Sequence, residues 1–274
     1  MAKAAEFERH VATLSKGPLT YYRAGQGTGV GADILYFHAA AGLHIGSLPR
    51  RLAENFRVWI PVAPGYEGTP ILDGVNSVPA IAELVSEFIA KEIRGPVDPI
   101  GTSFGARLAA WLTILHPEQV SHLVLMSPAG FRPPDAPPLS FDPEIMTKQL
   151  YAHPENKPAE TRSPVMLETN RAAMRHYGIG SSFDEELNNR IGEIDKVTLV
   201  LHGTKDVRVL PQSVQMLRYK IKLAQLVYVY DAAHSLDVDQ PQRVGDLVED
   251  FLLRGEAFIV HPGTPKPAQE RAAP

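Results

Sequence analysis

A serine flanked by glycines is the residue best suited to do chemistry. Residues 101–105 read Gly-Thr-Ser-Phe-Gly, between an apolar candidate strand and a segment of helical character. A nucleophile on a sharp strand-to-helix turn sits in strained backbone, and glycines two residues to either side let neighbouring backbone approach. The free N–H groups of the following helix would face negative charge that develops beside Ser103. We predict that Ser103 is a nucleophile; the alternative is an ordinary capping serine.

A serine hydroxyl needs a base, usually a histidine that a carboxylate holds in one tautomer. His234 lies in a loop after the apolar run 226–230, and Asp206 follows the apolar run 197–201. Catalytic groups of open α/β sheets gather at the carboxyl ends of strands, where Ser103, Asp206 and His234 all fall. The order serine, acid, histidine is a known triad order. We therefore predict a Ser-Asp-His triad.

Three further carboxylates stand close to His234 in the sequence, and each could rival Asp206 as the orienting acid. They are Asp231, Asp237 and Asp239. We interpret all three as solvated surface groups and keep Asp206 as the acid.

Acyl transfer also requires two backbone N–H groups that meet the negative oxygen of the tetrahedral intermediate. Phe104, directly after the nucleophile, is predicted to supply one. The loop 38–42, with three alanines and a glycine, allows close backbone approach and is predicted to supply the other. Within this loop we favour Ala40 over Ala39.

Short apolar runs alternate with longer segments of helical period, which indicates parallel strands joined by crossover helices. Ser77 is placed to cap a helix, and Pro96 and Pro99 weaken the strand before Ser103 because proline cannot donate ladder hydrogen bonds. The predicted strands are 19–23, 33–38, 56–60, 97–100, 122–126, 197–202 and 226–230, and the predicted helices are 77–91, 106–115, 144–151, 165–177 and a final one with its apolar face at 244–252.

One connection is too long for a plain loop. Residues 129–195 open with a proline-rich stretch and then show helical periodicity, which predicts an inserted helical cap. The core would comprise residues 1–128 and 196–260. The last fourteen residues, 261–274, contain four prolines and little apolar surface, which predicts a disordered tail.

The amino-acid composition excludes several classes of function. Of 274 residues, 44% are hydrophobic and 21% charged, as in globular domains. Lys plus Arg number 27 against 31 for Asp plus Glu, so the net charge of −4 argues against nucleic acid as a partner. Cysteine is absent, which excludes disulfides and a thiol nucleophile. A charged N-terminus and the lack of any apolar run near ~18 residues predict a cytoplasmic protein that binds no membrane.

Neither a cofactor nor a metal is expected. The glycines at 27–31 fit a dinucleotide-binding pattern literally, but they precede a strand where that pattern must follow one. His38 and His44 have no third ligand at metal spacing.

Several motifs, in this order and spacing, make the chain between residues 19 and 254 resemble the capped α/β-hydrolases, which include esterases and carbon–carbon bond hydrolases. Besides the serine motif they are His-Ala-Ala-Ala-Gly at 38–42, Pro-Val-Ala-Pro-Gly-Tyr-Glu-Gly at 61–68, His-Pro-Glu-Gln-Val at 116–120, Leu-Val-Leu-Met-Ser-Pro at 123–128, His-Gly-Thr-Lys-Asp at 202–206 and Ala-His at 233–234.

The resemblance implies an α/β fold: a mostly parallel, twisted sheet of about eight strands flanked by helices, with a helical cap inserted after the sixth strand. It also implies Ser103 as nucleophile, Asp206 as acid, His234 as base and a structural His38. The chain departs from the family at Ala39, where glycine is usual. A serine at the nucleophile position argues against the branches that hydrolyse haloalkanes or epoxides.

The sequence thus predicts a serine hydrolase that cleaves an ester-like bond of a small, largely apolar substrate through an acyl-enzyme on Ser103. One alternative keeps the triad but cleaves a carbon–carbon bond in a dienone or diketone. A second alternative is a non-catalytic protein that binds a small ligand in the cap cleft.

Overall fold

Eight strands form one sheet in a computed structural model that describes residues 6–27, 33–140, 142–180 and 183–259. The predicted tail 261–274 lies outside these residues. The strands are β1 (Glu8–Leu14), β2 (Gly17–Ala24), β3 (Asp33–Phe37), β4 (Val58–Pro61), β5 (Val97–Thr102), β6 (His122–Met126), β7 (Val197–Gly203) and β8 (Ala224–Val229).

The strand order is β1-β2-β4-β3-β5-β6-β7-β8. Only the pairs β1–β2 and β2–β4 are antiparallel, and all pairs from β4 to β8 are parallel. The predicted mostly parallel sheet of about eight strands is therefore confirmed. β1 was not among the seven predicted strands: it is an edge strand, largely exposed, and it lacks a continuous apolar run.

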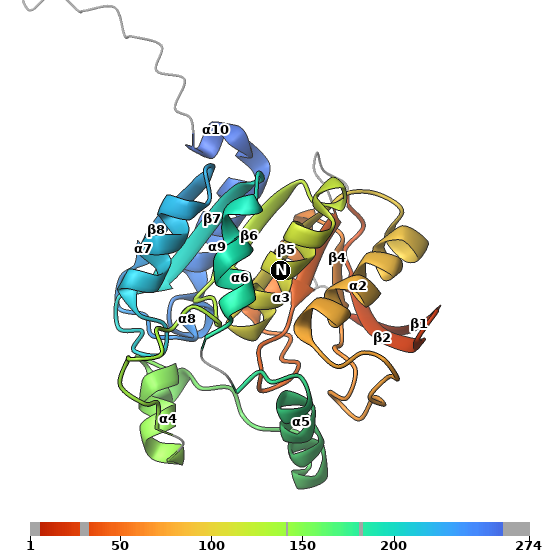
Figure 1. The fold of residues 1–274 in the computed structure, drawn as a ribbon, viewed down its shortest axis with the longest axis horizontal. Helices are drawn as coiled ribbons and strands as arrows, with labels where there is room; N and C mark the ends of the chain where they lie inside the picture. Colours follow the sequence, from red (N-terminus) through yellow and green to blue (C-terminus); the bar gives the residue numbers. More distant parts are fainter. Residues whose placement is uncertain (1–5, 28–32, 141, 181–182, 260–274) are drawn as a thin grey trace, which may run out of the picture.

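The helices are α1 (Ser47–Asn55), α2 (Val78–Phe88), α3 (Phe104–Leu115), α4 (Pro143–Leu150), α5 (Pro164–His176), α6 (Glu185–Arg190), α7 (Pro211–Lys220), α8 (Leu236–Asp239), α9 (Pro241–Arg254) and α10 (Glu256–Ile259), with short turns η1 (Ile89–Ile93), η2 (Pro117–Gln119), η3 (Pro154–Asn156) and η4 (Ile191–Glu193). Helices α2, α3 and α7 share one buried cluster, and α1, α8 and α9 share another. The sheet is thus covered on both faces (Figure 1). All five predicted helices are present.

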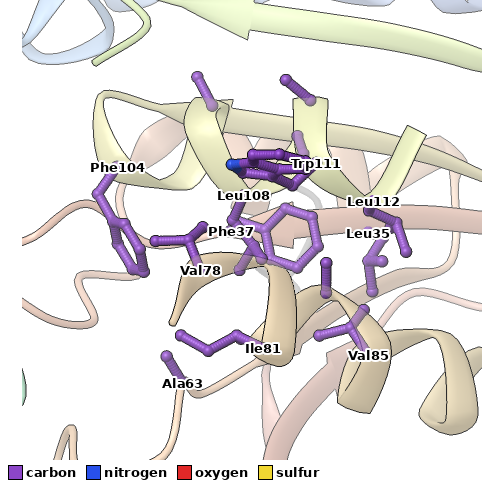
Figure 2. Close-up of a cluster of buried hydrophobic side chains, with 14 of the residues drawn as sticks. Leu35, Phe37, Ala63, Val78, Ile81, Val85, Phe104, Leu108, Trp111 and Leu112 are labelled. Atoms are coloured by element: carbon purple, nitrogen blue, oxygen red, sulfur yellow. The ribbon is translucent and has the colours of Figure 1, made fainter. Parts of the chain in front are cut away.

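The helix that follows Ser103 is fixed by apolar packing. Ile81 and Val85 of α2 face Leu108 and Trp111 of α3 over the buried Phe37 of β3 (Figure 2). Ser77 caps α2 through its Oγ, which accepts the Ala80 N–H at 3.3 Å, as predicted. This packing holds the start of α3 beside the end of β3.

The central strand β5 forms despite Pro99. The buried carboxylate of Asp98 accepts the His122 N–H at 2.9 Å, just before the β5–β6 pairing begins at Ile100. A side chain thus supplies a hydrogen-bond acceptor where the β5–β6 ladder starts, and Ser103 follows the carboxyl end of β5, a central strand of the sheet.

A helical insert follows β6, as predicted. Figure 1 shows α4 and α5 beyond one end of the sheet, whereas α6 lies against the core. Gly130 and Phe131 pair with Phe183, so the chain leaves and re-enters the core at one place. The predicted limits 129–195 include α6, whose Leu187 is buried in the core cluster. Among the described residues, none of the helices has the length and apolar character needed to cross a membrane.

Candidate active site

Ser103 occupies a sharp turn between β5 and α3. Its backbone angles, φ 57° and ψ −113°, are ones that residues with a side chain rarely adopt. A Cβ on Gly101 would lie 2.1 Å from the Gly105 carbonyl carbon, and one on Gly105 would lie 2.4 Å from the Phe37 oxygen. Gly101 therefore leaves room for the start of α3, and Gly105 lets α3 approach the end of β3.

His234 and Asp206 are in direct contact. Nδ1 of His234 lies 3.0 Å from Oδ2 of Asp206, and the two residues are both 5% exposed. The other carboxylate oxygen of Asp206 accepts the N–H groups of Arg208 at 2.8 Å and Val209 at 3.0 Å. His234 and Ser103 line the same cavity. The structure thus brings together the three residues of the predicted triad.

The environment of Asp206 favours its charged form. Burial acts to raise its pKa, but the charge and hydrogen bond of His234 and the Val209 N–H outweigh burial and lower the pKa to about 2. The ordinary value is about 3.9, so the folded state releases this proton more readily than the unfolded state. Asp206 therefore stabilises the fold above pH ~4, and this contribution is lost as the pH falls through about 2.

We expect this linkage to appear in acid unfolding. A depression of nearly two units corresponds to about 2 kcal/mol, so from pH 6 to pH 2 the wild type should lose about that much more unfolding free energy than Asp206→Asn. Urea titrations at both pH values measure the difference. Equal losses in the two proteins would contradict the depressed pKa of Asp206.

The loop that carries His234 is seated on the end of β7. Gly203 makes this possible, because a Cβ there would lie 2.4 Å from the carbonyl oxygens of both Ala232 and Ala233. The Lys205 N–H also donates to the Ala232 oxygen at 2.8 Å. The histidine loop and the acid loop are thereby held side by side.

Gly203→Ala is expected to push these loops apart. The clash is with backbone, so we expect a loss of about 2–3 kcal/mol in stability and at least a tenfold loss in kcat. Thermal unfolding and steady-state kinetics measure both. Gly95→Ala is the matched control, because a Cβ there meets nothing within 4 Å; equal behaviour of the two variants would refute this role of Gly203.

The orientation of the Ala40 N–H is fixed by its neighbours. The Ala39 oxygen accepts the Gly42 N–H at 3.0 Å and lies 2.9 Å from Nδ1 of His38. Nε2 of His38 accepts the Ala63 N–H at 3.1 Å, so Nδ1 carries the proton and donates to Ala39. In a planar trans peptide the Ala40 N–H points opposite to the Ala39 oxygen. His38 thus sets the direction of the Ala40 N–H.

Ala40 lines the cavity together with Ser103 and Phe104. The Phe104 N–H belongs to the first residue of α3 and has no acceptor within the helix. Both predicted oxyanion donors therefore lie at the cavity. Ala39, the weaker candidate, is not among its lining residues.

The insert holds this loop from the other side. Nδ2 of the buried Asn170 in α5 donates to the Ala41 oxygen at 3.2 Å and to Oε1 of Glu67 at 2.9 Å, and its Oδ1 accepts the Glu67 N–H at 2.9 Å. Arg162 donates to the same Ala41 oxygen. Oε1 of Glu67 also accepts the Leu43 N–H at 2.9 Å. Nothing in the local sequence indicated this network.

Asn170→Ala should therefore impair turnover without touching the nucleophile. We expect a loss of about 1–2 kcal/mol in stability and a roughly 10-fold lower kcat, with a smaller change in KM, because the loop of the predicted oxyanion donor Ala40 loses a support. The kcat–KM split is the measurement that separates positioning from substrate binding. The control is Asn156→Ala, an exposed asparagine in the same insert. An unchanged kcat in Asn170→Ala would contradict the role.

The interpretation of Asp239 as a solvated surface group is wrong. Asp239 is 5% exposed and accepts three backbone N–H groups, from Ala152, His153 and Ala233, at 2.8–3.0 Å. It therefore ties the segment after α4 to the loop of His234. Asp231 is partly exposed and pairs with His153 and Lys205.

The cavity beside Ser103 has a volume of about 120 Å³ and a mixed lining. Apolar side chains come from the insert and from the core, and among the described lining residues the only permanently charged side chains are those of Arg132 and Arg208. Neither arginine was predicted from the sequence. The lining residues are Ala40, Ser103, Phe104, Pro128, Ala129, Gly130, Arg132, Leu139, Met174, Ile179, Gly180, Arg208, Val209 and His234.

Within the part of the chain that the structure describes, no group of three or more His, Asp or Glu side chains could hold a metal ion. Both ring nitrogens of His38 are engaged by backbone groups.

Comparison with known proteins shows the family to which the chain belongs. Residues 28–247 match the family described as "Alpha/beta hydrolase family". The chain belongs to the α/β-hydrolase family. The resemblance found in the sequence is confirmed.

The similar proteins are hydrolases of more than one kind. This α/β-hydrolase is 31% identical over 182 residues to a 2-hydroxymuconate semialdehyde hydrolase from Pseudomonas putida; the match covers 59% of this chain and 64% of that relative, less than two thirds of its length. It is 21% identical to a pimeloyl-[acyl-carrier protein] methyl ester esterase from Aeromonas salmonicida, over 82% of this chain and 96% of the relative. A serine hydrolase structure from Cycloclasticus zankles superposes with a TM-score of 0.71 at 17% identity, over 90% of this chain and 98% of that one.

Proposed function

We propose that this α/β-hydrolase cleaves an ester-like bond of a small molecule through an acyl-enzyme on Ser103. The contact between His234 Nδ1 and Asp206 Oδ2, at the cavity that holds Ser103, carries the proposal. Because Nδ1 faces the carboxylate, it keeps its proton, and Nε2 is free to accept the proton of the serine hydroxyl.

In the first step Oγ of Ser103 attacks the substrate carbonyl carbon while Nε2 of His234 takes the hydroxyl proton. The negative oxygen of the tetrahedral intermediate accepts the N–H groups of Phe104 and Ala40. The intermediate collapses when His234 returns the proton to the leaving alkoxide. Water then attacks the acyl-enzyme carbonyl while Nε2 of His234 takes a proton from it. The second intermediate expels Oγ of Ser103, which His234 reprotonates, and the acid is released.

Labelling with a fluorophosphonate tests the nucleophile without requiring the natural substrate. We expect one adduct, located at Ser103 by peptide mass spectrometry. Ser103→Ala should lose it, and Ser121→Ala should keep it, because Ser121 lies at the opposite end of the strands, just before β6. A folded wild type without an adduct would refute the proposal and favour the non-catalytic binding protein.

Carbon–carbon bond hydrolysis is the second candidate, favoured by the similarity to the 2-hydroxymuconate semialdehyde hydrolase. It uses the same triad, so the residues do not separate it from ester hydrolysis. Parallel assays with an aryl ester and a ring-fission dienone do, because their relative kcat/KM values report which transition state the cavity fits.

A further inference from the structure

Two guanidinium groups lie at the cavity of Ser103, and neither forms an ion pair with a carboxylate of the described residues. Arg132 is 8% exposed and donates to the backbone oxygens of Pro137, Val207 and Arg208. The half-buried Arg208 donates to the amide oxygen Oε1 of Gln149 at 3.1 Å. All these acceptors are neutral, and the described lining of the cavity contains no Asp or Glu.

Neither oxygen of Asp206 accepts a hydrogen bond from the guanidinium of Arg132 or Arg208. Its two oxygens are taken by His234 and by the N–H groups of Arg208 and Val209. Burial lowers the pKa of Arg208; the charge of Asp206 opposes this effect, and the charge of Arg132, a smaller influence, adds to it. Buried charges are costly unless they are paired, so an anion beside Arg208 would offset a cost that the protein alone leaves open.

Because these two guanidiniums have no ion-pair partner in the described part of the chain, we propose that the substrate carries a carboxylate. This carboxylate binds Arg208 in the cavity while the scissile carbonyl lies at Ser103. The inference rests on the proposed function and names its substrate class, the esters of organic acids that keep a second, free carboxylate. Leu139, Met174 and Ile179 would contact the apolar body of such a substrate.

The roles of the two arginines differ. The guanidinium of Arg132 joins the proline-rich start of the insert to the loop after Asp206 through three carbonyls, so replacing it would disturb the fold. Arg208 has a single side-chain bond, to Gln149, and its backbone N–H stays on Asp206 whatever its side chain. Arg208 is therefore the specificity-determining residue to test.

Binding to Ser103→Ala measures the site without turnover. We would titrate the saturated dicarboxylates from succinate to suberate, and the diamides of the same lengths, by calorimetry at low salt. At least one dicarboxylate should bind about 10- to 100-fold more tightly than its diamide, as expected for charge-assisted hydrogen bonds, and its binding should weaken with added NaCl.

Variants in the Ser103→Ala background assign the site. Arg208→Gln should reduce dicarboxylate affinity about 10- to 100-fold, and Arg208→Lys should recover part of the loss. Arg218→Gln is the matched control: it removes the same charge from an exposed position on α7 and should leave the affinity unchanged.

Equal affinity for dicarboxylates and diamides in the salt titration, or undiminished affinity in Arg208→Gln, would overturn the proposal. Failure of fluorophosphonate labelling would instead overturn the nucleophile and leave the anion site standing. The two failures are thus distinguishable.

Discussion

Ser103→Gly is expected to lose nearly all turnover and yet melt at a higher temperature than the wild type. Without the hydroxyl the proposed acyl-enzyme cannot form, and kcat should fall about 10⁵- to 10⁶-fold. The backbone at φ 57° and ψ −113° costs a residue with a Cβ about 1–3 kcal/mol, which glycine avoids. Glycine also raises the conformational entropy of the unfolded chain, which lowers the stability by about 0.5–1 kcal/mol. The balance is a gain of about 1 kcal/mol, or roughly 2–4 °C in Tm.

Two controls separate strain from the loss of the hydroxyl. Ser103→Ala should lose the same turnover without the gain in Tm, because alanine keeps the Cβ. Ser121→Gly makes the same chemical change where φ is negative and should lower stability by about 0.5–1 kcal/mol. Calorimetry and ester hydrolysis measure both quantities. If Ser103→Gly melted below Ser103→Ala, the turn would not store the strain that its angles imply.

The sequence was sufficient for features that depend on local chemistry. Glycines at 101 and 105 are needed because backbone lies within 2.4 Å of where a Cβ would be, and that requirement is visible in the motif itself. The ends of β7 and β8 follow from apolar runs, so the pattern alone placed Asp206 and His234 at one edge of the sheet. The five helices follow from periodicity and capping residues.

What the sequence missed depends on contacts between distant segments. Asn170 and Glu67 are 103 residues apart, and nothing near either residue indicates that they meet at the Ala41 carbonyl. In the sequence Asp239 is one of several loop carboxylates, and two of the three N–H groups that it accepts come from the segment after α4 and meet it only in the fold. Arg208 and Arg132 likewise converge only in the fold, which adds charge to a cavity predicted to suit a largely apolar substrate.

These long-range contacts all join the insert to loops at the candidate active site. Through α5 the insert reaches the loop of Ala40, and through the segment after α4 it reaches the loop of His234. Both loops carry groups whose position within a few tenths of an ångström would decide the rate of acyl transfer. The insert therefore supports the proposed catalytic groups as well as covering the cavity.

Asp206→Asn is expected to lower kcat about 10⁴-fold while the loops stay in place. The asparagine Oδ1 can still accept the Arg208 and Val209 N–H groups, so the local fold should persist. Its NH₂ group would face Nδ1 of His234 and donate to it, which moves the imidazole proton to Nε2. Nε2 could then no longer take the proton of Ser103. The remaining rate would come from binding and from the Phe104 and Ala40 N–H groups.

The rival carboxylates provide the decisive comparison. Asp231→Asn should keep kcat within about threefold, because Asp231 pairs with His153 and Lys205 at the surface. Asp239→Asn should act mainly on stability, because Asp239 accepts backbone N–H groups and not the His234 ring. Kinetics report the rate, and ¹⁵N chemical shifts of His234 report its tautomer. A kcat above a tenth of wild type in Asp206→Asn would contradict the assignment of Asp206 as the acid. A larger loss of kcat in Asp239→Asn than in Asp206→Asn would contradict it as well. The contact of 3.0 Å between His234 Nδ1 and Asp206 Oδ2 predicts neither result.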